Sequence, residues 1–278
     1  MSVDDLLTQS RSATESGDHR QGAEGAETAL NHPDATPDNQ AKARELLALH
    51  RLRLGDYQDC VQQGLQALEF FTANGDLLAQ SRVHCTLALA FTDTALNETA
   101  LRHVLGALEA ARACGNPTAE FWALSRFSLV RGAMGDDARS IDLGRQALAV
   151  AQTLHDPETS FVAVNNLGDT YLVMAREAVN RGDDPTQPFT DALVLMREAV
   201  ALAQSQVNPF NEALARTNMV GIGTSGEAAR RDSAHDRADG RVAVSDAHQH
   251  HRDRARPPRG GEVPTGTAGG TAPGRRTR

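Results

Sequence analysis

The sequence predicts an all-α protein: a right-handed solenoid of antiparallel helix pairs over residues 1–222, followed by a disordered tail over residues 223–278. The first observation is that small residues recur every forty positions, at Ala48, Ala88, Ser128 and Gly168. The second is that residues suited to cap a helix N-terminus recur at the same interval, at Thr36, Asp76, Asn116 and Asp156. Self-similarity of this length indicates a repeat array, in which each helix pair buries its apolar face against the next.

Composition supports helices packed through small side chains. Hydrophobic residues make up 40% of the 278 residues and aromatic residues only 4%, so the expected core is aliphatic. The net charge of −8 is unevenly distributed, because residues 223–278 hold eleven Arg against seven Asp and Glu, which leaves −12 on residues 1–222. An acidic body with one lysine, Lys42, argues against a nucleic-acid groove.

Each unit is predicted as a helix, a turn and a returning helix. The first unit has expected helices at residues 3–13 and 19–30. The second has a helix from residue 37, a turn at 54–56 and a returning helix at 57–71. The third has a helix from residue 77, a turn near 95–97 and a returning helix at 98–113. The fourth runs from Pro117 to a turn at 134–136 and returns over 138–154. In the fifth, about a dozen extra residues ending near Pro188 separate the first helix from a second at 189–204, and a sixth unit opens at residues 210–222 without a partner helix.

The spacing also predicts how the helices pack. Residues twelve and nineteen positions after Ala48, Ala88 and Ser128 are small as well. In the fifth unit, once the extra residues are allowed for, Ala192 and Ala199 take these places. Residues seven apart share a helix face, so the two helices of a pair can approach closely. Larger side chains precede each small position and are expected to fill the space between units: Leu47, Leu87, Phe127 and Leu167.

The pattern resembles the tetratricopeptide repeat family. The resemblance rests on Asn166-Leu167-Gly168 with Tyr171, Ala192, Ala199 and Pro209, and on Leu87-Ala88 with Phe91, Ala100 and Ala107. It covers residues 1–222 and implies stacked pairs whose first helices line a concave surface that binds a partner. The forty-residue spacing is longer than the usual thirty-four, and is similar to arrays that precede diguanylate cyclase domains or lie within LuxR-type regulators in bacteria.

The helical phase places a row of side chains on this concave surface. Its members are Lys42, Glu45 and Leu49, then Arg82, Cys85 and Leu89, then Trp122, Ser125, Arg126 and Leu129, then Asn165, Asn166 and Asp169. Trp122 with Arg82 and Arg126 would suit an aromatic or acidic anchor of a peptide, and Asn165 and Asn166 could hydrogen-bond its backbone. Each residue alone could instead be solvated or packed on its neighbour.

The row predicts a non-enzymatic scaffold for a protein or peptide partner, in the cytoplasm. The alternative is a regulatory fragment of a signalling protein that has lost its output domain. No nucleophile, base and orienting acid converge, and no cofactor or metal is expected. The three cysteines are widely spaced, and no apolar leader or membrane-spanning run occurs.

The last segments carry three further predictions. The helix at residues 210–222, with Phe210, Leu214 and Met219, has an uncovered apolar face that could drive self-association. The tail could be an out-of-frame translation of a longer array, because the pattern stops where a second helix should follow. Gly221–Gly226 matches a nucleotide-binding motif, and His248, His250 and His251 form a histidine run, but neither has the surrounding pattern such a site needs.

Overall fold

The computed structural model describes residues 1–206, 208–209 and 211–219, all within one compact unit, Met1–Ala229. Helices make up most of this part, and no strand occurs in it. They are α1 (Val3–Ser16), α2 (His19–Leu30), α3 (Pro37–Leu54), α4 (Tyr57–Ala73), α5 (Leu77–Asp93), α6 (Asn97–Ala113), α7 (Pro117–Ala133), α8 (Asp137–Leu154), α9 (Pro157–Arg181) and α10 (Thr186–Ser205). Residues 211–219 are also helical. The predicted tail, the glycine motif and the histidine run lie outside the described residues.

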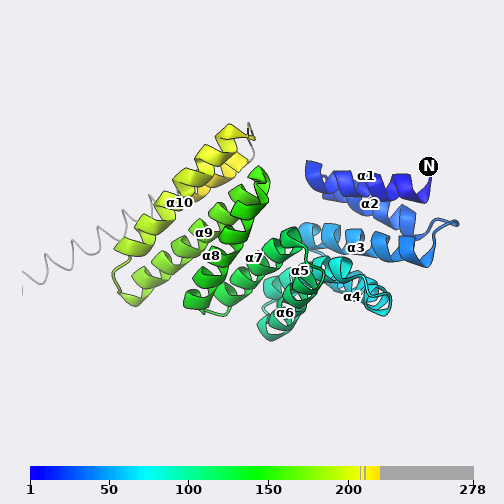
Figure 1. Ribbon diagram of the computed structural model, residues 1–278, viewed down its shortest axis with the longest axis horizontal. Coiled ribbons are helices and arrows are strands. Elements are labelled where there is room, and N and C mark those ends of the chain that lie inside the picture. The colour runs from blue at the N-terminus through cyan, green and yellow to red at the C-terminus, as the bar shows by residue number, and fades with distance from the viewer. Residues whose placement is uncertain (207, 210, 220–278) are drawn as a thin grey trace, which may run out of the picture. The chain divides into compact units, whose positions relative to one another are not determined.

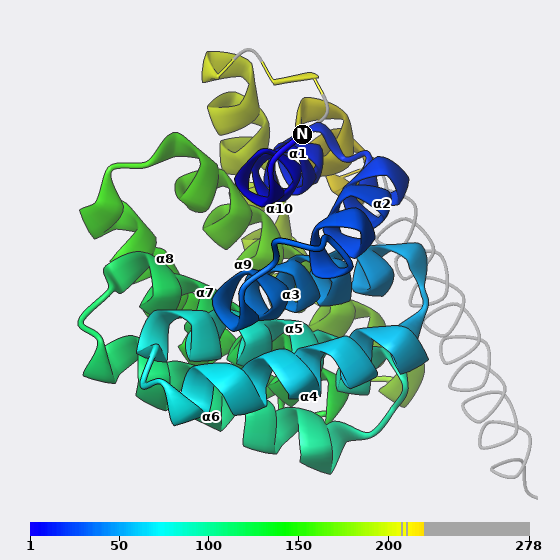
Figure 2. The same cartoon turned by 90° about the vertical axis from the view of Figure 1, so that its right-hand side faces the viewer.

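Helices stack in chain order as antiparallel pairs, which confirms the right-handed solenoid (Figure 1). Each helix contacts the next, and each odd-numbered helix also contacts the next odd-numbered helix from α1 to α9. No such contact joins successive even-numbered helices in the described part of the chain. The odd-numbered helices therefore form the inner, concave face, and in Figure 2 α4, α6 and α8 lie outside α3, α5 and α7.

The predicted caps begin the helices. The side chains of Thr36, Asp76, Asn116 and Asp156 each accept a hydrogen bond from the backbone amide three residues on. This satisfies one of the free amides of the first turn, and a cap of this kind contributes about 1 kcal/mol. The forty-residue interval seen in the sequence is therefore the distance along the chain between the starts of successive first helices.

Close packing of small residues holds each pair together, as the spacing predicts. Cys60, Ala100, Ala192 and Ala199 are fully buried. At Ser128 the hydroxyl donates to the carbonyl of Ser140 at 2.7 Å, across the two helices of the fourth pair. The approach of the two backbones is therefore close enough for a serine side chain to bridge them.

Two of the large residues before the small positions fill glycine-lined hollows in the preceding unit. A Cβ atom built on Gly64 of α4 would lie 2.7 Å from Leu87 Cδ2, and one on Gly144 of α8 would lie 2.9 Å from Leu167 Cδ1. Both leucines are buried. The leucines were predicted to fill the space between units, and the structure adds that each packs against a glycine of the preceding unit.

The extra residues of the fifth unit form helix rather than a separate insertion. Instead of stopping after the length of α7, α9 continues to Arg181, with Ala175 and Ala178 extending its buried stripe. Gly182 ends it at φ 77°, and α10 begins at Thr186, before the expected residue 189. The extra residues therefore lengthen α9 and supply its turn into α10, because apolar residues spaced four and three apart favour a helix.

The third unit makes its turn without glycine. Gly55 and Gly135 occupy equivalent turn positions with φ of 79° and 74°, whereas Ala95 adopts φ 59°. A side chain in this left-handed region is strained by about 1 kcal/mol. The neighbouring cap is also missing, since Leu96 offers no side-chain hydrogen bond to α6.

Candidate peptide-binding surface

The concave face is built from α3, α5, α7 and α9, because these helices contact one another along the inside of the stack. One column of partly buried side chains runs along it at forty-residue intervals, at Leu49, Leu89, Leu129 and Asp169. Burial raises the pKa of the Asp169 carboxyl, while the charge of Arg176 acts in the opposite direction. The column is therefore apolar over three units and weakly acidic at the fourth.

Arg82 on α5 is already paired within the protein. Its guanidinium binds both carboxylate oxygens of Glu45 on α3, with Nη2 3.1 Å from Oε2. Two parallel charge-assisted bonds of this kind hold both side chains in one geometry. Arg82 therefore links the second unit to the third, and its charge is neutralised before any partner arrives.

Arg126 on α7 is held differently. Its guanidinium carbon lies 4.9 Å from the centroid of the Trp122 ring, and Trp122 packs edge-on against Phe121. Burial lowers the pKa of Arg126 to about 10, which leaves it charged at neutral pH. Among the described residues it has no ion-pair partner. The stacked ring fixes the orientation of a guanidinium that remains free to bind an anion.

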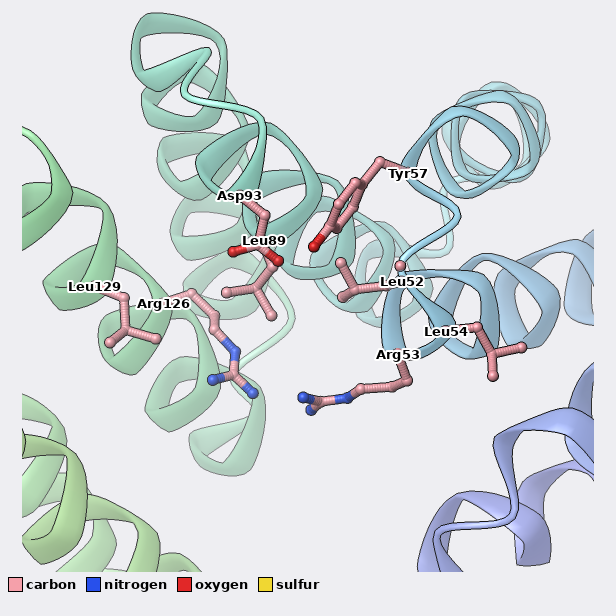
Figure 3. A pocket seen from close by; sticks show the side chains of 9 residues that line it. Leu52, Arg53, Leu54, Tyr57, Leu89, Asp93, Arg126 and Leu129 are labelled. Carbon is pink, nitrogen blue, oxygen red and sulfur yellow. The ribbon is translucent and has the colours of Figure 1, made fainter. Parts of the chain in front are cut away.

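A pocket of about 550 Å³ opens beside Arg126 (Figure 3). Its lining comes from the end of α3, the turn into α4, and the faces of α5 and α7: Leu52, Arg53, Leu54, Gly55, Tyr57, Leu89, Asp93, Arg126 and Leu129. The Tyr57 hydroxyl hydrogen-bonds to Asp93, whose charge raises the pKa of that hydroxyl. The pocket thus combines leucine walls with two guanidinium groups and one carboxylate.

The neighbouring Asn165 and Asn166 of α9 bond to different helices. The Asn166 amide donates to Ser125 Oγ on α7 at 3.1 Å, whereas the Asn165 carbonyl accepts from the Asn218 amide at 3.3 Å. Asn165 is 7% exposed, so it has little surface to offer a partner. Asn166 is partly buried and borders the concave face.

Arg53, Tyr57 and Asp93 were not among the predicted surface residues. Arg53 lies one helical turn after Leu49, and Asp93 lies one turn after Leu89. Extending the predicted column by one turn at each unit would have found both. Tyr57 starts a second helix and carries no such signal, because its place depends on the turn geometry at Gly55.

The described residues offer neither a metal-binding cluster nor a membrane-spanning helix. No group of three or more His, Cys, Asp or Glu side chains in this part of the chain could hold a metal ion. None of its helices combines the length and apolar character required to span a bilayer.

Comparison with solved structures places the fold among tetratricopeptide-repeat proteins. A Rap protein complexed with Competence and Sporulation Factor aligns over 80% of this chain and 75% of its own, with 15% identity and a TM-score of 0.57. A tetratricopeptide-repeat protein of Thermus thermophilus aligns over 79% of this chain and 100% of its own, with 17% identity and a TM-score of 0.58. At these low sequence identities, the similarity between this chain and the two proteins lies in the fold.

A third similar structure is part of a larger protein. A Signal Transduction ATPase with Numerous Domains protein from Pyrococcus horikoshii, which has a tetratricopeptide repeat sensor, aligns over 77% of this chain at 14% identity and a TM-score of 0.59. The chain spans 31% of that protein's length. No protein-family model and no curated protein sequence matches the chain.

Proposed function

We propose that this protein is a non-enzymatic scaffold that binds a peptide or an extended segment of a partner protein on its concave face. The observation that carries the proposal is the pocket between α3 and α7, where Trp122 orients the unpaired Arg126 beside leucine side chains. An aromatic ring and an arginine beside apolar surface is the composition most enriched at protein-binding hot spots. The Rap protein complexed with Competence and Sporulation Factor supports it as a similarly folded protein with a bound partner.

The remaining predicted residues would have secondary roles. Asn166 can offer its amide to a partner's backbone if it exchanges its bond to Ser125, and Asp169 can accept a backbone N–H. Arg82 would contribute mainly by holding α5 against α3, because its charge is paired with Glu45. Asn165 would support the junction with residues 211–219 rather than the partner.

Affinity capture with the purified chain tests the proposal. We expect Trp122→Ala combined with Arg126→Gln to abolish recovery of the partner while the helical circular dichroism is unchanged. The matched control is Arg102→Gln on α6, an exposed arginine whose guanidinium bonds only Thr99 in its own helix. Unchanged recovery with the double variant would refute the proposed surface. Once a partner is recovered, titrating it against the unmodified chain, the double variant and the control would give the affinity of each.

A sensor module within a signalling assembly is the second candidate. The observation that favours it is the similar fold of the protein with a tetratricopeptide repeat sensor, in which the matching part is about a third of the chain. If this candidate holds, the recovered partner will carry an enzymatic or DNA-binding domain whose activity changes on addition of the chain. All three cysteines are free, which is consistent with a reducing compartment such as the cytoplasm.

Self-association is a separate proposal. Leu214 in the last helical segment is 39% exposed, whereas Ala215 beside it is fully buried against α9 and α10. An exposed leucine at the end of a repeat array can pair with a second copy. Light scattering over a hundredfold concentration range would detect it, and a strictly monomeric mass throughout would contradict it.

A further inference from the structure

Two guanidinium groups face each other across the pocket. Arg53 projects from the last turn of α3 and Arg126 from α7, on either side of α5 (Figure 3). Neither has an ion pair with any described residue. The nearby positive charge of Arg53 adds to burial in lowering the pKa of Arg126. Like charges that converge without a counterion between them are unfavourable, and an anion placed between them removes that cost.

The repeat shows what is missing at this position. Arg82 on α5 pairs with Glu45, which lies 37 residues earlier on the preceding first helix. The residue 37 positions before Arg126 is Leu89, on the preceding first helix and in the lining of the pocket. In the forty-residue register Cys85 takes the place of Glu45, so the third unit supplies no carboxylate at that position, and a leucine lines the pocket beside Arg126.

We propose that this pocket binds a single Asp or Glu side chain of an extended partner segment, with its carboxylate held between Arg53 and Arg126 and a neighbouring aliphatic side chain packed on Leu52, Leu89 and Leu129. The inference rests on the proposed scaffold function and names the chemistry of its main anchor. Guanidinium groups bind carboxylates through paired N–H donors, and the leucine walls need an apolar group that a free anion does not have.

The surrounding charge limits the ligand to one carboxylate. Asp93 lies in the same pocket and is held there by the Tyr57 hydroxyl, so it repels a second acidic group. The chain as a whole has a net charge of −8, and residues 1–222 carry more negative charge than that. A polyacidic segment or a polyphosphate would meet repulsion over most of the concave face. The pocket is thus a local positive site on an acidic protein.

The only tryptophan of the chain provides a direct signal. Trp122 stacks on Arg126, so an anion bound to that guanidinium should change its fluorescence. The probes are the capped peptides acetyl-Leu-Glu-Leu-amide and acetyl-Leu-Gln-Leu-amide, titrated to millimolar concentration into the full chain, with inorganic phosphate as a third arm. We expect the Glu peptide to bind about tenfold or more tightly than the Gln peptide, the size expected for losing charge-assisted bonds. Phosphate should produce at most the weak response of an anion that makes no apolar contact.

Three variants assign the signal to the pocket. Arg53→Gln and Arg126→Gln should each reduce binding of the Glu peptide about tenfold, and Arg102→Gln should leave it unchanged. Leu89→Glu places a carboxylate in the lining of the pocket that also contains Arg126, so it should pair with that guanidinium and prevent binding of the Glu peptide. We expect the melting temperature of this variant to be unchanged or raised, which would show that its loss of binding is not caused by unfolding.

The outcomes separate the anchor from the scaffold. Equal binding of the Glu and Gln peptides, unaffected by Arg53→Gln, would overturn the carboxylate anchor and leave the concave binding face standing. A response to phosphate as strong as the response to the Glu peptide would also overturn it, in favour of a small-anion site. The same holds if the Glu peptide gives no response at millimolar concentration, or if only an uncapped peptide with a free C-terminal carboxylate binds.

Discussion

Gly22 on α2 is the position where an added methyl group has the most severe consequence. A Cβ atom built there would lie 2.2 Å from His50 Cε1 and 2.3 Å from His50 Nε2. His50 on α3 is fully buried, so its ring has no adjacent solvent to move into. The substitution Gly22→Ala must therefore expel the His50 ring or separate the first helix pair from the second.

His50 is also fixed by hydrogen bonds on both ring nitrogens. The Ser10 hydroxyl donates to the Gly22 carbonyl at 2.8 Å, so the His50 Nε2–H is the donor to the Ser10 carbonyl at 3.0 Å. In the neutral ring the His50 Nδ1 then accepts from the His19 Nδ1–H, at 3.2 Å. Displacing the ring breaks both bonds, and the bond to the Ser10 carbonyl is buried.

The magnitude follows from opposing contributions. Gly→Ala within a helix stabilises by about 0.5–1 kcal/mol, because glycine loses more backbone freedom on folding. Overpacking costs about 1–3 kcal/mol, and each lost hydrogen bond costs about 0.5–1.5 kcal/mol. For Gly22→Ala the costs exceed the gain, and we expect a net loss of roughly 2–4 kcal/mol, concentrated in the interface between the first and second units.

Hydrogen exchange is the assay that matches this location. The first pair is at the end of the stack, so its loss of stability appears as local opening of residues 3–30 rather than as global unfolding. Amide exchange there should accelerate about tenfold for each 1.4 kcal/mol lost. Urea unfolding followed by circular dichroism should show an earlier, low-amplitude transition for the same helices.

Gly25→Ala is the matched control on the same helix. The nearest atom to a Cβ built at Gly25 is the Leu6 carbonyl oxygen at 3.6 Å, an ordinary contact. This variant should therefore show only the propensity gain, about 0.5–1 kcal/mol of stabilisation. If Gly22→Ala proves as stable as Gly25→Ala, the steric reasoning is wrong. If the double variant Gly22→Ala with His50→Ala exchanges no more slowly than Gly22→Ala alone, the clash with His50 is not the cause.

Three further predictions use other features of the fold. The His84 and His103 rings meet at 2.9 Å between their Nδ1 atoms, and burial lowers the pKa of His103 from 6.5 to about 4. The unfolded chain therefore takes up the proton first, so the contribution of His103 should be constant well above pH 6.5 and should lower stability by about 1.4 kcal/mol per pH unit as pH drops towards 4. Replacing both rings with glutamine should weaken the pH dependence of urea unfolding, while His19 and His50, whose pKa values are also lowered, leave a remainder. Ala95→Gly should raise the free energy of unfolding by about 0.5–1 kcal/mol by relieving the left-handed conformation, and an unchanged urea midpoint would contradict the strain. Cys114 is partly exposed, while burial raises the pKa of Cys60 to about 12, so thiol reagents at neutral pH should label Cys114 first; faster labelling of Cys60 would contradict the packing.

Most of the fold could be predicted because its determinants are local and periodic. The N-caps at Thr36, Asp76, Asn116 and Asp156 fix where units start, and small residues at a constant interval fix which faces meet. The length of α9 could not be predicted in the same way. Beyond Tyr171 the sequence no longer follows its own repeat, so helix and spacer could be distinguished only by the buried alanines of that segment.

The candidate site was only partly predictable, because its chemistry depends on pairing between units. The forty-residue phase correctly put Arg82 and Arg126 on first helices, but it cannot say which of the two has a carboxylate within reach. That depends on whether the preceding first helix carries an acidic residue: Glu45 pairs with Arg82, whereas Cys85 takes the place of Glu45 in the next unit. Whether a partner uses these residues stays a prediction.

Polar residues on the first helices mainly connect one unit to the next. Glu45 binds Arg82 across α3 and α5, and Ser125 binds Asn166 across α7 and α9. These links satisfy polar groups that would otherwise be poorly solvated between helices, and they hold adjacent first helices at fixed separations. Between α5 and α7 no such link joins Arg126 to an acidic residue among the described ones, so its charge, like that of Arg53 in the same pocket, is not balanced by an ion pair. A carboxylate bound between α3 and α7 would bridge two helices that make no direct contact, and would therefore fix the curvature of three successive units at once. Binding at this position would thus provide both an anchor for a partner and a means by which the partner sets the shape of the surface that holds it.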